Sequence, residues 1–517
     1  MSPHKHTGLH PPKISRRTII GLMGIFLSAI MAGLNNRVGV LGLADVRGAL
    51  GFGSDEASWL STFYTLGELI ATPFTPWFAI TFTIRRFHFM MISVCVVIAV
   101  LLPFVHDLHL LILLRFIQGM SSGALIPILI MLVMKTMPPH FRLYGLAVYA
   151  MTATFAPNLA SWLTGLWTDN LNDWRWVYWQ VIPICILSGL LAGFGLPYEK
   201  IQMIRFKEAN WFGMTIGIVA LTLLGIALDQ GVRLDWFNSP LITVSLVVGL
   251  LFLCIYLVTE WFHHVPFLKL QLLNRRNLWL GASVFICLLI VLLSGSQLPA
   301  NYLMTIQDYR ALQIGPIGLL VALPQLVLGS VVALFLYQKW IDARYVFATG
   351  LSLIAVACFS VAQVTIDWNR DQFVLAHILH AFGQPMTIVP LLFLMTSIVN
   401  PNEGPYFAGT INTLRILGSL IGSAAIGQFL AVRGRFHFEM LLDHAALARN
   451  AQPLDTSQLI NIVAQQSQVL SVADAYRVLG ALAIMLIPLI LKLTYIPAPD
   501  VTVSPILAGT PSPSSHG

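Results

Sequence analysis

Long apolar segments alternate with short polar ones along almost the whole chain. Each apolar segment is close to the roughly 20 residues that an α-helix needs to cross a hydrocarbon layer of about 30 Å. The pattern therefore predicts an all-α polytopic membrane protein. We expect fourteen helices, beginning near Thr18, Ala57, His88, Leu108, Leu143, Trp176, Trp211, Leu241, Leu278, Ile314, Tyr345, Gln372, Pro405 and Val472.

The composition agrees with this pattern. Of the 517 residues, 57% are hydrophobic and only 10% are charged, and the mean hydropathy is +0.79. Soluble domains average about 25% charged residues. So few charges cannot cover the surface of a soluble protein of this length. We therefore expect either the movement of a compound across a bilayer or a reaction inside one.

Lysine and arginine residues are distributed unevenly over the predicted loops. The loops on one side carry Lys13, Arg16, Arg17, Arg85, Arg86, Lys135, Arg142, Lys200, Arg205, Lys207, Lys269, Arg275, Arg276, Lys339 and Arg344. The loops on the other side carry Arg47, Arg175, Arg233, Arg310, Arg370 and a few basic residues after helix 13. Because cytoplasmic loops are enriched in such residues, both termini are predicted to be cytoplasmic, in an inner or plasma membrane. The net charge of +7 thus reflects topology and not a nucleic-acid partner.

A weak internal repeat suggests two related halves. The fourth helix carries a polar motif at 115–119 followed by Pro127, and the twelfth carries one at 380–385 followed by Pro390. Parallel repeats of this kind are typical of transporters. The predicted units are a cytoplasmic tail (1–17), a six-helix bundle (18–198), an inserted helix pair (199–268), a second six-helix bundle (269–496) and a disordered tail (497–517). Within the second bundle, the polar segment at about 432–471 is expected outside the membrane as short helices.

No motif indicates a cofactor or a metal site. The five cysteines, all in predicted helices and without a C-x-x-C pair, are expected to be free buried thiols: Cys95, Cys185, Cys254, Cys287 and Cys358. The chain lacks the phosphate-binding motif G-x-x-x-x-G-K-[ST], so nothing indicates ATP use. An i, i+3 pair, His377 and His380, lacks an accompanying carboxylate or cysteine and is interpreted as packing.

Several short motifs carry a family resemblance. Residues 115–119 read R-F-I-Q-G, 172–176 read N-D-W-R-W, 229–231 read D-Q-G, and 409–422 form a Gly-rich helix with Asn and Arg. In this order they resemble the major facilitator superfamily, in its fourteen-helix drug:proton antiporter branch of EmrB- and QacA-like pumps. The resemblance covers about residues 18–496. It implies two six-helix bundles plus an inserted pair, working by alternating access.

The chain also departs from that family. Where the first helix of the family usually carries an Asp before a T-I-V-N-V run, residues 34–38 read L-N-N-R-V. The Gly-rich basic loop after helix 2 is reduced to T-F-T-I-R-R at 81–86, and the antiporter motif of helix 5 is reduced to Pro157 with its neighbours and Gly165. An acidic residue is missing and a cation, Arg37, has appeared. Substrate and coupling details therefore do not transfer directly.

Glu68 is the most informative charged residue within a predicted helix. It lies about eleven residues into helix 2 and has no basic neighbour in sequence. Charged groups inside membranes are costly, about 2.5–3.5 kcal/mol each at the helix centre, and usually mark function or a pair. An apolar setting disfavours the ionised carboxylate, so such a group can load and release a proton. We predict that Glu68 is the principal proton carrier; the alternative is a static ion pair with Arg37 or Arg115.

Three arginines are candidates beside it. The resemblance implies a role in proton transfer for Arg115, whose permanent charge would tune a nearby carboxyl group; the alternative is a structural pair. Arg37 is expected either to contact an anionic or polar substrate or to extend to the outer interface. Arg415 is the buried cation of the second half and a candidate for the cavity.

Other polar residues at membrane depth either line a substrate cavity or only bond neighbouring helices. They are Asn35, Tyr64, Gln118, Asn158, Gln297, Asn301, Gln384 and Asn412. Gly145, Pro157 and Gly165 of helix 5 are expected to permit close approach and bending as the bundles rock. Asp229, near the outer end of helix 7, is expected to be solvated.

The predicted function is a proton-coupled secondary active exporter of amphipathic or lipophilic organic compounds, of the multidrug efflux type. An alternative is a dedicated exporter of a metabolite such as a siderophore or an organic acid. A membrane-embedded enzyme is disfavoured because no catalytic cluster has suitable spacing, so the chain is not predicted to be an enzyme. The expected partners are a small-molecule substrate, protons and membrane lipid. The resemblance adds a periplasmic membrane-fusion adaptor and an outer-membrane channel as candidate partners in an organism with two membranes.

Overall fold

The computed structural model describes residues 15–447 and 456–499, and helices form all the regular secondary structure of these residues. The first group of helices comprises α1 (Arg16–Leu41), α2 (Leu43–Leu50), α3 (Ser54–Thr81), α4 (Ile84–Leu101), α5 (Leu108–Gly123), α6 (Leu125–Thr136), α7 (Pro139–Gly165), α8 (Trp176–Trp179) and α9 (Val181–Gly195). A pair follows, α10 (Trp211–Gln230) and α11 (Pro240–Phe262). The last group comprises α12 (Arg276–Leu292), α13 (Gln297–Thr305), α14 (Ala311–Leu336), α15 (Ala343–Val361), α16 (Val374–Thr396), α17 (Gly404–Leu447) and α18 (Thr456–Leu491).

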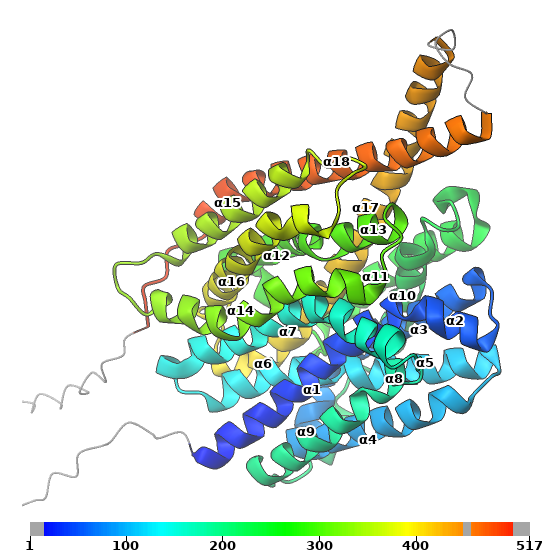
Figure 1. Cartoon of the computed structure of the whole chain (residues 1–517). Coiled ribbons are helices and arrows are strands. Elements are labelled where there is room, and N and C mark those ends of the chain that lie inside the picture. Colours follow the sequence, from blue (N-terminus) through cyan, green and yellow to red (C-terminus); the bar gives the residue numbers. More distant parts are fainter. Residues whose placement is uncertain (1–14, 448–455, 500–517) are drawn as a thin grey trace, which may run out of the picture.

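The long helices lie roughly side by side in one bundle (Figure 1). In the described residues, twelve helical segments are long and apolar enough to cross a membrane, with α5–α6, α8–α9 and α12–α13 each forming one segment. The helices α3 and α7, of 28 and 27 residues, are equally long and pack inside the bundle, and each carries polar side chains within its length, among them Glu68 in α3 and Asn158 in α7. Together these are fourteen long helices, compatible with the predicted number.

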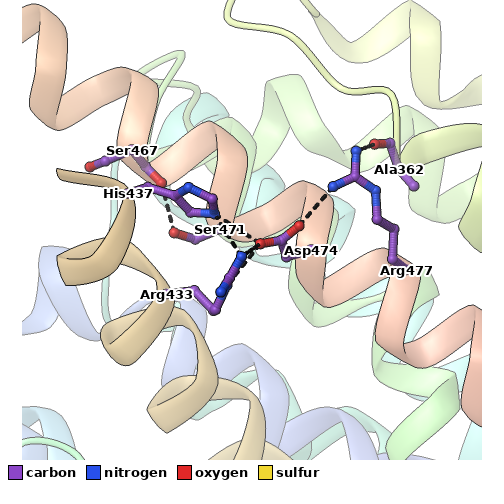
Figure 2. A network of polar contacts seen from close by, with 7 residues as sticks. All are labelled: Ala362, Arg433, His437, Ser467, Ser471, Asp474 and Arg477. Atoms are coloured by element: carbon purple, nitrogen blue, oxygen red, sulfur yellow. Dashed lines mark hydrogen bonds and ion pairs between the residues drawn. The ribbon is translucent and has the colours of Figure 1, made fainter. Parts of the chain in front are cut away.

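The two ends of the bundle are distinguished by the helix ends that they contain. The terminal end is where α1 begins at Arg16 and α18 ends at Leu491, and the hairpin end is the opposite one. At the hairpin end α17 and α18 project beyond the other helices (Figure 1). The carboxylate of Asp474 in α18 accepts hydrogen bonds from Arg433 and His437 of α17 and joins the two helices there (Figure 2). The helix starts agree with the predictions to within four residues, except that α18 begins at Thr456 and not near Val472.

The expectation of short separate helices at about 432–471 was wrong. Residues up to Leu447 continue α17, and residues from Thr456 onward already belong to α18. An apolar run ends where a helix leaves the hydrocarbon, but the helix itself continues as long as its residues favour helix. This segment is rich in Ala, Leu and Gln, which are good helix formers.

The packing places the inserted pair against the junction of the two halves. α10 packs on α11, and also on α3 of the first group and α17 of the last group. The two groups meet most extensively where α7 packs antiparallel along α14. At the hairpin end Gly165 lies against Leu312, and at the terminal end the rings of Tyr144 and Tyr337 lie 5.5 Å apart. The division into two six-helix bundles stays a prediction.

The prediction of five buried thiols was partly wrong. All five cysteines are free, and Cys95, Cys185 and Cys358 are buried, but Cys254 is exposed and Cys287 is only partly buried. Cys254 lies on α11, much of whose surface faces away from the other helices. In a membrane protein such an apolar outer face is covered by lipid, so the apolar pattern alone does not separate it from the core.

Candidate functional site

Glu68 lies at a very close contact between α3 and α5. Glycines make this approach: a Cβ on Gly119 would lie 2.0 Å from the Tyr64 carbonyl oxygen, and a Cβ on Gly67 would lie 2.2 Å from that of Phe116. Gly123 similarly lies against the Glu68 backbone, where a Cβ would be 2.6 Å from Cα. Small residues allow membrane helices to approach to backbone contact. The glycine of the R-x-x-Q-G motif thus holds α5 directly beside Glu68.

The Glu68 carboxylate is buried, with 5% of the residue exposed, and it is not ion-paired. The Asn36 side-chain amide of α1 donates a short hydrogen bond to Oε2. Within the part of the chain that the structure describes, no lysine or arginine nitrogen lies within 4.0 Å of this carboxylate. Arg37, Arg115 and Arg415 are nevertheless close enough to interact with it electrostatically. The static pairs with Arg37 or Arg115 considered above are not formed in this conformation.

Arg115 is held by aromatic rings and by one amide. It is 2% exposed, and its Nη1 donates to Gln118 Oε1 at 2.7 Å. Its guanidinium carbon lies 4.3 Å from the Tyr64 ring centroid and 5.4 Å from that of Tyr178. Such cation–π contacts stabilise a desolvated guanidinium without an acid. Asn35 completes the group by donating to the Tyr64 hydroxyl at 3.1 Å, so the structure brings together four residues predicted for the site.

Arg415 and Asn412 connect α17 to α7. Arg415 donates to the Thr152 hydroxyl at 2.7 Å and to the Thr152 carbonyl at 2.6 Å. The Tyr149 hydroxyl donates to Asn412 Oδ1 at 2.8 Å. Neither Thr152 nor Tyr149 was predicted, since each has an ordinary place in an apolar helix. These bonds join the two groups of helices close to Glu68.

Arg37 differs from the other two arginines because its guanidinium makes no hydrogen bond or ion pair with the described residues. Arg37 is half-buried on α1, and its guanidinium nitrogens are accessible to solvent. It interacts electrostatically with Glu68 and with Arg415, both of which belong to the bundle interior. The side chain therefore lies within reach of both groups of helices, and its contact with substrate stays a prediction.

A second polar group lies where α7 meets α14 and α16. Gln325 donates to Gln384 Oε1 at 3.1 Å, and the Asn158 amide donates to the same oxygen at 3.3 Å. Thr154 donates a short hydrogen bond to Gln325 Oε1. The sequence predicted Asn158 and Gln384 but missed Thr154 and Gln325. A lone glutamine inside the apolar helix α14 was the available signal.

The remaining predicted residues are more scattered. Gln297 accepts a hydrogen bond from Ser423 at 2.9 Å, whereas Asn301 is exposed on α13 and no contact brings it to Glu68. Gly145 packs on Val133, Pro157 lines a small cavity with Asn158 and His377, and Gly165 lies against Leu312.

Three further side chains were expected to be structural or solvated. His377 and His380 are buried and lie beside the Phe373 carbonyl and Ser294, at 2.8 and 3.3 Å. Asp229 is exposed and accepts a hydrogen bond from Thr62. These positions agree with the packing and solvated roles that the sequence indicated.

Glu260 is a buried acid that the sequence analysis did not single out. It is fully buried at the end of α11, where Asn210 donates to one oxygen at 3.0 Å and the Leu268 backbone amide to the other at 2.9 Å. These bonds tie the loop after α11 to the start of α10. Glu260 thus holds together the start of α10 and the loop after α11, and it does not interact with Arg37, Arg115 or Arg415.

The hairpin end is closed by an ion-pair cluster that we call the latch. Arg310 Nε lies 2.6 Å from Asp169, and its Nη2 lies 2.9 Å from Asp45. The Asp169 carboxylate also accepts from the Leu312 backbone amide at the start of α14, at 3.0 Å. The hydrogen bond to Asp169 raises the pKa of Arg310 above its ordinary value. Asp45 and Asp169 belong to the first group of helices and Arg310 to the last, so the latch joins them.

The terminal end is closed as well, since Met134 of α6 packs against Gly404 of α17 and Tyr144 contacts Tyr337. The conformation therefore has the groups of helices in contact at both ends, with Glu68 and Arg115 buried inside the bundle. In the described residues, no group of three or more His, Cys, Asp and Glu could hold a metal ion.

This arrangement agrees with the comparison with known protein families. The Major Facilitator Superfamily matches residues 25–423, most of the chain. The chain belongs to the Major Facilitator Superfamily. It is a multi-pass membrane protein of this transporter superfamily.

Curated relatives and a solved structure extend this result. The chain is 25% identical over 425 residues to "Probable multidrug resistance protein EmrY" of Escherichia coli K12, covering 81% of each chain. It is 23% identical over 486 residues to "Fatty acid resistance protein FarB" of Neisseria gonorrhoeae, covering 90% of this chain and 94% of that protein. The crystal structure of the human organic anion transporter MFSD10 matches with a TM-score of 0.54 at 14% identity, covering 92% of this chain and all of that one. At this identity the structural match concerns the fold alone.

Proposed function

We propose that this protein is a proton-coupled secondary active exporter that works by alternating access, exchanging protons for amphipathic or lipophilic organic compounds. The observation that carries the proposal is Glu68: a buried carboxylate without an ion pair, hydrogen-bonded to Asn36 and surrounded by three arginines. A carboxylate in such a place can gain and lose a proton without breaking a structural ion pair. Its position between the groups of helices lets their rearrangement change which side it faces.

The interfaces supply the moving parts of this proposal. The latch closes the hairpin end, while the contacts of Met134 and Tyr144 close the terminal end. Alternating access requires that the contacts at the two ends break in turn while the middle of the α7–α14 contact, at Gly315 and Gly318, persists. The small residues at Gly165, Gly315 and Gly318, which let the two backbones touch, suit a rocking contact.

The names of the relatives support export as the direction of transport. Those most similar include proteins named for multidrug resistance or multidrug export. A second candidate is the dedicated export of an organic acid, favoured by the unpaired Arg37 and consistent with a relative named for fatty acid resistance. In both cases we assign the terminal end to the cytoplasm of an inner or plasma membrane. A periplasmic adaptor and an outer-membrane channel stay predictions from the resemblance.

The test is substrate efflux by the protein reconstituted into vesicles with an imposed pH gradient. Wild-type protein should dissipate the gradient when an accepted compound is added. Glu68→Gln should abolish the response of transport to the gradient, because the amide cannot carry a proton. Glu439→Gln, which changes an exposed carboxylate on the projecting part of α17, is the matched control and should behave as wild type. An unchanged response in Glu68→Gln would end the proposal.

A further inference from the structure

The charges around Glu68 do not balance. Arg37, Arg115 and Arg415 all interact electrostatically with this one carboxylate, so the region has an excess of two positive charges when Glu68 is ionised and three when it is protonated. Buried charges in proteins are usually paired, because leaving one unpaired in a medium of low dielectric constant is costly. Arg115 is buried, whereas Arg37 and Arg415 are half-buried, so an anion that enters beside these two would offset the excess.

The three arginines are satisfied to different degrees. Arg115 is enclosed by Tyr64, Tyr178 and Gln118, and Arg415 makes two hydrogen bonds to Thr152. Arg37 has no hydrogen bond or ion pair with any described residue. Its five N–H donors are thus free to bind, and a guanidinium matches a carboxylate, sulfonate or phosphate in two parallel hydrogen bonds.

The surroundings of Arg37 argue against a purely interfacial role. A side chain that extends to the membrane surface would leave the bundle interior, but Arg37 interacts electrostatically with both Glu68 and Arg415. Its neighbours Asn35 and Val38 are fully buried, and Gly39 lies against the guanidinium of Arg115. Two cations from opposite groups of helices, Arg37 of α1 and Arg415 of α17, thus interact electrostatically with each other and with Glu68.

We propose that Arg37, assisted by Arg415, binds the anionic group of the transported compound, so that the substrate is an amphipathic organic anion. The anion bridges α1 and α17, offsetting the repulsion between the two guanidinium groups. Its apolar part lies among the buried side chains between the helices. This inference rests on the proposed transport function and names its substrate class.

Protonation of Glu68 should strengthen anion binding, because it removes the one negative charge in the region. The charged and titratable groups facing Glu68 are Arg37 of α1, Arg115 of α5, Arg415 of α17 and Tyr64 of its own helix. α10, on the other side of α3, contributes Asp229, which is hydrogen-bonded to Thr62. Of these groups, Glu68 is the acid that interacts with both Arg37 and Arg415, so its protonation is the change expected to affect an incoming anion.

The experiment measures equilibrium binding to the full chain in lipid nanodiscs, with empty nanodiscs subtracted. Three radiolabelled probes share one ring system and differ in charge: 2-naphthoate, 2-naphthylmethanol and 2-naphthylmethylammonium. We expect wild-type protein to prefer the naphthoate. Arg37→Gln should weaken naphthoate binding by about ten- to hundredfold, the usual range for losing a charge-assisted hydrogen bond, and leave 2-naphthylmethanol unchanged. Arg37→Lys should retain most of the preference, and Glu68→Gln should bind the naphthoate at least as tightly as wild type.

The outcomes separate this inference from the proposed function. The inference is overturned by a wild-type protein that does not bind the naphthoate in preference to the other probes, or by an Arg37→Gln variant with wild-type naphthoate affinity. Efflux that keeps its pH response in Glu68→Gln would remove proton coupling but leave the anion site standing. If Arg37→Gln loses affinity for all three probes equally, its fold is damaged, and the Arg37→Lys variant then decides the question. An Arg37→Lys variant that also loses affinity for all three probes equally overturns the inference.

Discussion

Replacing Gly119 by alanine tests whether the backbone contact between α3 and α5 positions the charged residues. The added Cβ would lie 2.0 Å from the Tyr64 carbonyl oxygen, whereas ordinary contacts begin at 3.4 Å. The two helices would therefore have to separate by about 3.4 − 2.0 = 1.4 Å at this point. The carbonyl oxygen belongs to the α3 backbone and the Cβ is fixed directly to the α5 backbone, so neither atom can move away alone. Overpacking of this kind usually costs about 1–3 kcal/mol.

The displacement should affect transport more than folding. α3 carries Glu68 and Tyr64, whereas α5 carries Arg115 and Gln118, so separation moves the carboxylate away from the arginine and opens the cation–π contact. A misplacement of about 1 Å at a chemical site can cost roughly a hundredfold in rate. We expect Gly119→Ala to lower the apparent melting temperature in detergent and to reduce pH-driven efflux by at least about tenfold.

Gly48→Ala is the matched control. Gly48 lies in α2, and a Cβ there would meet nothing within 4 Å. Alanine in a helix is favoured over glycine by about 0.5–1 kcal/mol, so this variant should be as stable as wild type or slightly more stable, with unchanged efflux. A Gly119→Ala variant that matches Gly48→Ala in both melting temperature and efflux would show that α3 and α5 are not in backbone contact.

Two other contacts yield predictions. Arg310→Gln breaks both ion pairs of the latch, and exposed ion pairs are worth about 0.2–1 kcal/mol each. In a cysteine-free background that carries a Ser161→Cys reporter, this change should increase labelling by a membrane-impermeant maleimide by roughly 2- to 30-fold. Labelling equal to that of the parent would show that the latch does not hold the hairpin end closed. Gln384→Leu removes the hydrogen-bond acceptor that Asn158 and Gln325 share. Because hydrogen bonds between membrane helices average about 0.6 kcal/mol, this change should lower the free energy of unfolding by roughly 1 kcal/mol. Gln338→Leu, at the terminal end, is the control. No difference in stability between these two variants would argue against the polar contact of α7 with α14 and α16.

The sequence predicted the features that depend on short stretches of chain. The starts of most helices follow from apolar length alone, and Glu68 stood out because a carboxylate interrupts an apolar run. Asn35, Tyr64, Arg115 and Gln118 were all among the predicted residues, and the structure places them in one group. Their common depth in the membrane could be counted from the helix boundaries, which is why this part of the site was predictable.

The features that the sequence missed depend on contacts between distant segments. Thr152 and Tyr149 bind α17 only because α7 passes beside it, and the latch joins residues that are 265 positions apart in the case of Asp45 and Arg310. Glu260 resembled an ordinary helix-end carboxylate until Asn210 and Leu268 were seen to enclose it. The projecting hairpin was missed for another reason, since its helices continue beyond the apolar signal used to find them.

With the proposed anion site, the charge at position 37 determines how a proton and a substrate influence each other. A cationic substrate near Glu68 would compete with the proton for the same negative charge, so proton uptake would release it directly. An anion bound by Arg37 has the opposite relation to the proton. Protonation of Glu68 removes a negative charge beside Arg37 and Arg415, so the proton and the anion each favour the binding of the other. Antiport of an anion therefore cannot rest on competition within the site. It requires that protonation of Glu68 act through the rearrangement of α3 against α1 and α17, after which the anion leaves because the two arginines have moved apart.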